Sequence, residues 1–219
     1  MTTTRRALAD GLGTAVLLAV VVGSGIMGER LSGGNDALAL LANALATGFG
    51  LVALILSFGP RSGAHFNPVV TAALAFRKEF PVREVWPYVV AQFAGALLGV
   101  LAAHAMFDVP LLQLGDKERL GASQWWSEIV ATFGLVFVVL SCDRKSAPFA
   151  VGAYIAAAYW FTASTSFANP AVTLARAFTE TFSGIRPADI LPFMLAQVLG
   201  AALAVAADRY FFDAKKDAQ

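Results

Sequence analysis

Six long apolar stretches, joined by short polar segments, constrain the fold of this chain more than any other feature. They are Ala7–Met27, Ala37–Phe58, Trp86–Phe107, Trp125–Cys142, Pro148–Phe167 and Ile190–Ala207. A helix needs about 20 apolar residues to cross the hydrocarbon core of a bilayer. Only 14% of the residues are charged, whereas soluble domains carry roughly 25%. The sequence therefore predicts an all-α membrane protein with six transmembrane helices.

Lysine and arginine are unevenly distributed over the segments between these stretches, and cytoplasmic loops are enriched in both. With six crossings, eleven of the 16 basic residues fall on one side and five on the other. The larger group is Arg5, Arg6, Arg61, Arg77, Lys78, Arg83, Arg144, Lys145, Arg209, Lys215 and Lys216. We expect a multi-pass protein of the plasma (inner) membrane, surrounded by lipid, with both termini in the cytoplasm. The net charge of +1 indicates no nucleic-acid partner.

Two segments with the shared pattern Asn-Pro-x-Val-Thr follow apolar stretches, one at Asn67-Pro68 and one at Asn169-Pro170. Asparagine favours the N-cap of a helix, and proline favours its first turn. Charged residues soon end each segment, so neither is long enough to span the membrane. Non-helical backbone is tolerated at membrane depth only where protein or water covers it. We therefore expect two re-entrant half-helices.

An internal repeat relates the two halves of the chain. The pattern Ala-Gln-x-x-Gly-Ala begins at Ala91 and again at Ala196, and an acidic residue, Asp10 or Glu128, opens each half. Three apolar stretches separate equivalent positions, so the second half enters the membrane in the opposite orientation. We expect one domain, residues 1–219, built from inverted repeats at about 1–108 and 124–219, with its functional site near the midplane.

Inverted entry directs the N-termini of both half-helices toward the membrane centre. Two positive dipole ends there oppose protons and cations, while the side-chain amides of Asn67 and Asn169 can donate hydrogen bonds to a neutral solute. The central motifs contain no titratable residue except His65 and no arrangement typical of a catalytic triad or zinc site. The residues predict a conduit for small uncharged molecules, without enzymatic activity, cofactor or metal. A proton-coupled transporter remains an alternative, since that class shares inverted repeats and broken helices.

With these motifs the chain resembles the major intrinsic protein family, the aquaporins and aquaglyceroporins, over nearly its whole length. The resemblance rests on the segment 62–68, on Asn169-Pro170-Ala171 and on both Ala-Gln repeats, although Val69 replaces the usual alanine. It implies a right-handed bundle of six helices with two half-helices, and a homotetramer with one pore per subunit. It places Asn67, Pro68, Asn169 and Pro170 at the pore centre.

The resemblance also assigns roles to three polar residues. Asp10, which stands where glutamate is usual, and Glu128 would orient the loops beside the half-helices, because an acid inside a membrane needs hydrogen-bond partners. His65 would line the cytoplasmic part of the pore, with a hydrogen-bonded structural histidine as the alternative.

The selectivity filter departs from that of most relatives, because Val172 stands where the family places an arginine. Family spacing assigns the other filter positions to Thr47, Ala157 and Ser166, all of them small. The resemblance therefore implies a wide filter that passes glycerol-like polyols, urea, water and undissociated metalloid hydroxides such as arsenous or methylated arsenic acids. A filter with threonine at its first position and valine at its last is similar to that of a bacterial subgroup associated with arsenic resistance. A water-selective aquaporin is the alternative. Arg176, one helical turn after Val172, either partly replaces the missing cation at the outer mouth or anchors the half-helix.

Overall fold

A computed structural model describes residues 1–212 of the chain. Lys215 and Lys216, which entered the predicted orientation, lie outside the described residues. Within residues 1–212 the backbone forms eight α-helices and one short 3-10 turn, without strands, as the sequence predicts. The elements are α1 (Thr3–Leu31), α2 (Asp36–Ser62), α3 (Pro68–Phe76), α4 (Val82–Phe107), α5 (Ala122–Ser141), α6 (Ala147–Phe161), α7 (Pro170–Arg176), η1 (Pro187–Asp189) and α8 (Ile190–Phe212).

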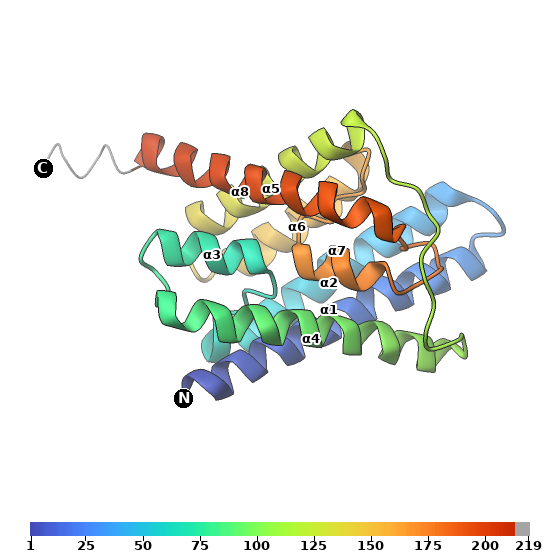
Figure 1. The fold of residues 1–219 in the computed structure, drawn as a ribbon, viewed down its shortest axis with the longest axis horizontal. Helices are drawn as coiled ribbons and strands as arrows, with labels where there is room; N and C mark the ends of the chain where they lie inside the picture. Colours follow the sequence, from blue (N-terminus) through green and yellow to red (C-terminus); the bar gives the residue numbers. More distant parts are fainter. Residues whose placement is uncertain (213–219) are drawn as a thin grey trace, which may run out of the picture.

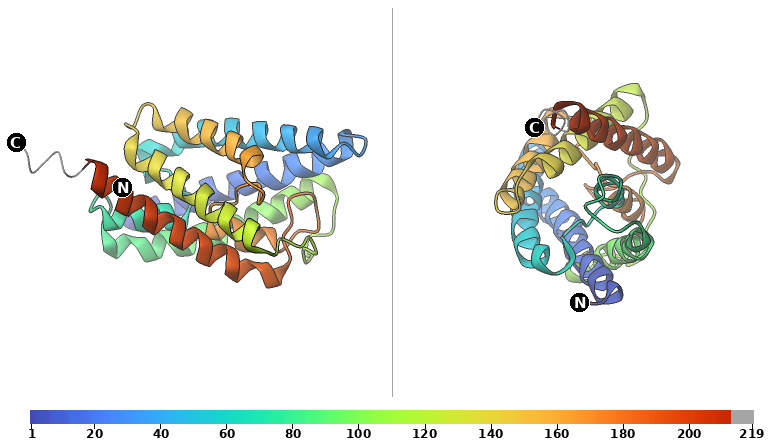
Figure 2. Two further views of the ribbon diagram at one scale, coloured as in Figure 1. Left: turned by 90° about the horizontal axis from the view of Figure 1, so that it is seen from above. Right: turned by 90° about the vertical axis from the view of Figure 1, so that its left-hand side faces the viewer.

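The six longer helices form a bundle around the two short helices, α3 and α7. Figure 1 shows α3 and α7 between α8 on one side and α4 on the other, and each of them contacts both of these helices. The view along the bundle in Figure 2 shows the long helices surrounding this central pair. The start of α1 and the end of α8 lie at the same end of the bundle (Figure 1). The fold therefore holds two half-helices among the six longer ones, with one face of α3 left exposed.

One predicted span is shorter than expected. In the described part of the chain, five helical segments are long and apolar enough to cross a membrane, whereas α6 has only 15 residues and ends at Phe161 instead of Phe167. Its length of about 22 Å is less than the hydrocarbon thickness of about 30 Å. The helix ends where Thr162 adopts an extended backbone, with φ −112° and ψ 136°, and the loop before α7 then places Thr165, Ser166 and Ala168 at positive φ.

Close glycine contacts fix the same helix crossing in both halves of the chain. A Cβ atom on Gly95 of α4 would collide with the carbonyl oxygen of Gly11 in α1. A Cβ atom on Gly200 of α8 would collide with the carbonyl oxygen of Ile129 in α5. Small residues let membrane helices approach closely. The pairs α1/α4 and α5/α8 therefore pack closely beside the half-helices.

Candidate pore and selectivity site

The carboxylate of Asp10 holds the loop that leads into α3. Asp10 is fully buried in α1 and accepts hydrogen bonds from the backbone amides of His65 at 2.9 Å and Phe66 at 3.0 Å. The Ser62 hydroxyl, at 2.9 Å, and the Gln92 side-chain amide, at 2.8 Å, donate two more. Hydrogen bonds to an ionised acceptor are roughly twice as strong as neutral ones. This acid therefore supplies acceptors to loop amides that no helix satisfies.

Glu128 does the same for the loop that leads into α7. Its carboxylate accepts hydrogen bonds from the backbone amides of Phe167 and Ala168, both at 2.8 Å. The Ser164 hydroxyl and the Gln197 side-chain amide donate to it at 2.6 Å. The loop donors to Glu128 lie 102 residues after those to Asp10 (for example, 164 − 62), and the same offset separates the two Asn-Pro motifs. Both acids thus stand where the family resemblance places loop-orienting residues.

The two half-helices meet through their capping asparagines. The side-chain oxygen of Asn67 accepts a hydrogen bond from the amide of Val69 at 3.1 Å, and that of Asn169 accepts one from Ala171 at 3.0 Å. Each side-chain nitrogen then donates to the opposite loop, from Asn67 to the carbonyl of Ala168 and from Asn169 to that of Phe66, both at 2.8 Å. Because a primary amide carries two N–H bonds, each asparagine side chain keeps one N–H that is not used in this contact.

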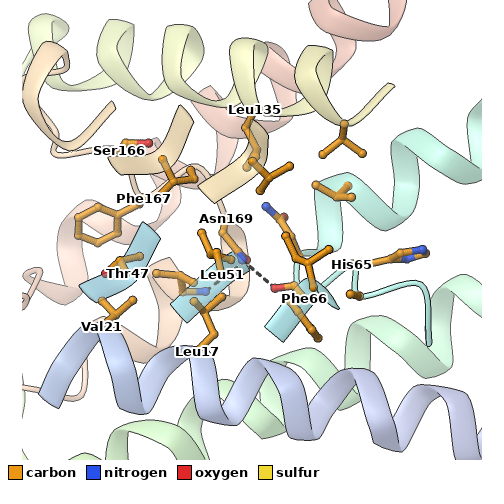
Figure 3. Close-up of a pocket in the computed structure, with 18 of the residues that line it drawn as sticks. Leu17, Val21, Thr47, Leu51, His65, Phe66, Leu135, Ser166, Phe167 and Asn169 are labelled. Carbon is orange, nitrogen blue, oxygen red and sulfur yellow. Dashed lines mark hydrogen bonds between the residues drawn. The ribbon is translucent and has the colours of Figure 1, made fainter. Parts of the chain in front are cut away.

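A cavity of about 130 Å³ runs past both asparagines. Figure 3 shows Thr47, Ser166 and Phe167 toward one end, Asn169 in the middle and His65 toward the other end. Most of the remaining wall is aliphatic and includes Leu17, Val21, Leu51, Leu135, Val151 and Ile155. The cavity therefore has hydrogen-bonding groups in an otherwise apolar wall.

His65 lines this cavity and is also held by the protein. Its Nδ1 atom lies 3.0 Å from the hydroxyl oxygen of Thr71, within α3. The side chain of His65 therefore fits both interpretations, because it lines the cavity and also contacts a hydroxyl of the protein.

Three of the four predicted filter residues, Thr47, Ser166 and Val172, line the cavity together. Ser166 is 3% exposed, and its hydroxyl oxygen has no hydrogen-bond partner in the described residues. An unpaired buried hydroxyl is costly. It is therefore available to a solute or water passing this end of the cavity, which we call the Thr47 end.

The fourth predicted filter residue, Ala157, lies elsewhere. It is exposed on the outer face of α6 and does not line the cavity, whereas Ile155 and Tyr159 do. At 3.6 residues per turn, a position two residues away points to nearly the opposite side of the helix. The Tyr159 hydroxyl lies 3.2 Å from that of Thr47. A tyrosine thus occupies the place that family spacing assigned to an alanine.

Arg176 reaches the Thr47 end from the last turn of α7. It is 2% exposed and lines the cavity, and its guanidinium carbon lies 3.4 Å from the ring centroid of Phe167. Its Nε atom donates to the carbonyl of Ser183. Within residues 1–212 its terminal nitrogens make no hydrogen bond. Arg176 is therefore anchored and also presents cationic donors near the cavity, which combines the two roles considered from the sequence.

A second arginine, which no motif in the sequence indicates, lies close by. Arg119, in the connection between α4 and α5, is 6% exposed and donates to the carbonyls of Gly184 at 3.1 Å and Ser164 at 2.9 Å. Its guanidinium carbon lies 4.7 Å from the Phe167 ring centroid. Burial lowers the pKa of Arg119 to about 10, so it remains a cation at neutral pH. It lies about 50 residues from the second Asn-Pro motif, so only tertiary folding brings them together.

These placements change the expected character of the filter. Besides three small residues, the Thr47 end contains the rings of Tyr159 and Phe167 and the cation of Arg176. The four predicted residues alone would make this end small throughout and free of cations. In the structure Tyr159 lines this end where Ala157 was expected, and Arg176 supplies a cation one helical turn after Val172.

Comparisons with known proteins agree with this architecture. The sequence profile described as major intrinsic protein matches residues 1–157. Aquaglyceroporin AqpS of Rhizobium meliloti (strain 1021) is 54% identical over 210 residues, which are 94% of this chain and 90% of the relative. Probable aquaporin AqpM of Archaeoglobus fulgidus is 30% identical over 237 residues, covering 93% of this chain and 95% of the relative. The X-ray structure of the aquaglyceroporin from Plasmodium falciparum shares the fold, with a TM-score of 0.74 at 19% identity and complete coverage of both chains. The chain therefore belongs to the major intrinsic protein family.

Proposed function

We propose that this protein is a passive transmembrane channel for small uncharged solutes, such as glycerol-like polyols, and for water. The observation that carries the proposal is the cavity beside the junction of the two facing half-helices, with asparagine amides in an otherwise aliphatic wall. A polyol has hydroxyls for the amides and C–H groups for the apolar side, and pore selectivity follows such lining groups. The 54% identity to a protein named an aquaglyceroporin supports the same class of solute.

Charge exclusion follows from the same residues. The N-termini of α3 and α7 meet at the asparagines, and each helix N-terminus carries a partial positive charge. Arg119 and Arg176 add two full positive charges near the Thr47 end. This positive field repels cations and protons along the path, whereas a solute without net charge is not repelled.

The range of solutes depends on the Thr47 end. Thr47 and Val172 favour a broad range that includes urea and undissociated metalloid hydroxides, among them arsenous and methylated arsenic acids. Tyr159, Phe167 and Arg176 favour the second candidate function, a water-selective channel, because rings and a cation narrow the path. The balance between these groups decides the ratio of solute to water flux.

Stopped-flow light scattering on proteoliposomes tests the proposal with glycerol, urea and water, and uptake of arsenous acid tests the metalloid solutes. We expect glycerol flux in the wild type, and a Val172→Arg variant that loses most of it while keeping more of its water flux. Ala157→Val, on the exposed face of α6, is the matched control and should behave as the wild type. Water flux without glycerol flux would establish the water-selective alternative, and accumulation driven by a pH gradient would establish the transporter.

We place the channel in the plasma (inner) membrane with both termini in the cytoplasm, as a homotetramer with one pore per subunit. The eleven-to-five distribution of basic residues and the shared end of α1 and α8 support the orientation. The tetramer rests on family resemblance. Protease accessibility of a C-terminal tag in sealed vesicles tests the orientation, and cross-linking in intact membranes tests the assembly.

A further inference from the structure

A second hollow, larger than the pore cavity, lies on the outside of the bundle. It has a volume of about 480 Å³ and lies between α3 and α8, which contact each other and run side by side in Figures 1 and 2. Ala72 and Phe76 of α3 form one wall, and Val198, Ala202 and Ala206 of α8 form the other. All five are exposed, and their aliphatic and aromatic surfaces make the groove apolar.

A cation lines one end of the groove. Arg209, in the last turn of α8, lines the groove and is exposed, and its guanidinium carbon lies 4.3 Å from the ring centroid of Phe76. Its neighbour Asp208 is paired with Arg77 at 3.1 Å. Arg209 itself makes no ion pair with any carboxylate of residues 1–212. The aromatic ring therefore holds a guanidinium whose hydrogen-bond donors are not used by the described chain.

The dimensions of the groove match one leaflet of a bilayer. From Val198 to Arg209 the axis of α8 rises about 16 Å, and one leaflet contributes about half of a hydrocarbon core of about 30 Å. The last turn of α8, which contains Arg209, lies at the end of the bundle where α1 starts (Figure 1), and the distribution of basic residues predicts that this end faces the cytoplasm. The apolar part of the groove then lies at acyl-chain depth, and the cation lies at headgroup depth.

We propose that this groove binds one anionic phospholipid, with an acyl chain along α3 and α8 and the headgroup phosphate on Arg209. Guanidinium groups bind phosphate through two parallel hydrogen bonds. A zwitterionic lipid offers the same chain and phosphate, but its headgroup also carries a positive charge that Arg209 repels. The site is independent of which solute passes through the pore.

Native mass spectrometry of the full-length protein in mild detergent tests this site. The protein is titrated with phosphatidylglycerol or phosphatidylcholine carrying identical acyl chains. A basic residue at a membrane surface contributes about 1 kcal/mol to anionic lipid binding, so we expect phosphatidylglycerol to bind about fivefold more tightly. Arg209→Gln should abolish this preference by weakening phosphatidylglycerol binding more than phosphatidylcholine binding, and Ala206→Phe should weaken the binding of both lipids by filling the groove.

Arg83→Gln is the matched control, because Arg83 is another exposed arginine on the predicted cytoplasmic side and does not line the groove. It should keep the full preference for phosphatidylglycerol. An Arg209→Gln variant that keeps this preference would overturn the proposal, as would wild-type binding of both lipids by Ala206→Phe. The same spectra report the number of subunits. Dissociation of the oligomer in Ala206→Phe would show that a second copy of the chain, and not a lipid, fills the groove.

Discussion

Replacing Glu128 by glutamine should loosen the loop that positions Asn169 and the Thr47 end. In the wild type, Oε1 of Glu128 accepts hydrogen bonds from Ser164 and Phe167, and Oε2 accepts them from Ala168 and Gln197. A glutamine presents one N–H₂ group in place of one of these oxygens. Whichever way it is oriented, two groups that donate to Glu128 in the wild type then face another donor.

The expected loss of stability follows from this count. A buried donor left without its acceptor costs about 1–3 kcal/mol, so two cost about 2–6 kcal/mol. A flip of the Gln197 side-chain amide recovers one of them, and loss of a buried charge offsets a further part. We therefore expect about 3 kcal/mol, which corresponds to a melting temperature lower by about 6–12 °C for a chain of this size.

Thermal unfolding in detergent and glycerol flux in proteoliposomes measure the two consequences. The inverted repeat provides an internal comparison, since Asp10→Asn removes the equivalent acceptor and should lower the melting temperature similarly. Glu29→Gln, on the exposed part of α1, is the control and should leave both measurements unchanged. A Glu128→Gln protein with wild-type melting and flux would refute the view that this acid holds the pore loop.

Three further predictions concern packing and the Thr47 end. Gly95→Val should overpack the α1/α4 crossing and lower the melting temperature, at a cost of about 1–3 kcal/mol in stability. Gly59→Ala, with open space around it, is the control and should be neutral or slightly stabilising. Equal melting temperatures of the two variants would contradict the close packing of α1 against α4. Tyr159→Phe removes a hydroxyl paired with Thr47 and should lower the stability of the protein by about 0.5–1.5 kcal/mol. It should also change the ratio of glycerol flux to water flux. The matched variant Tyr210→Phe, on the exposed end of α8, should leave that ratio unchanged. Arg119→Gln should raise that ratio by freeing Phe167 and the loop at Ser164; an unchanged ratio in light-scattering assays would show that this arginine does not position the filter.

Much of the architecture could be predicted because its causes are local in the sequence. Apolar length determines which segments enter a bilayer, and Asn-Pro determines where a helix begins, so α3 and α7 start at the expected prolines, Pro68 and Pro170. The repeated Ala-Gln patterns indicated the inverted halves, and the structure places Gln92 and Gln197 on Asp10 and Glu128 in equivalent ways.

The Thr47 end was decided by tertiary structure, because its groups come from separate elements and are selected by geometry. The hydrophobic pattern of α6 does not reveal that its helix ends at Phe161, where an extended residue leads into the positive-φ loop held by Glu128. Helix rotation then turns Tyr159 inward and Ala157 outward. Arg119 reaches Phe167 only because the loop carbonyls of Ser164 and Gly184 accept its hydrogen bonds. By itself the sequence determined that the chain crosses a membrane and carries two facing half-helices, since hydrophobic length and capping act locally. Which side chains line the Thr47 end of the cavity was settled by contacts between distant residues.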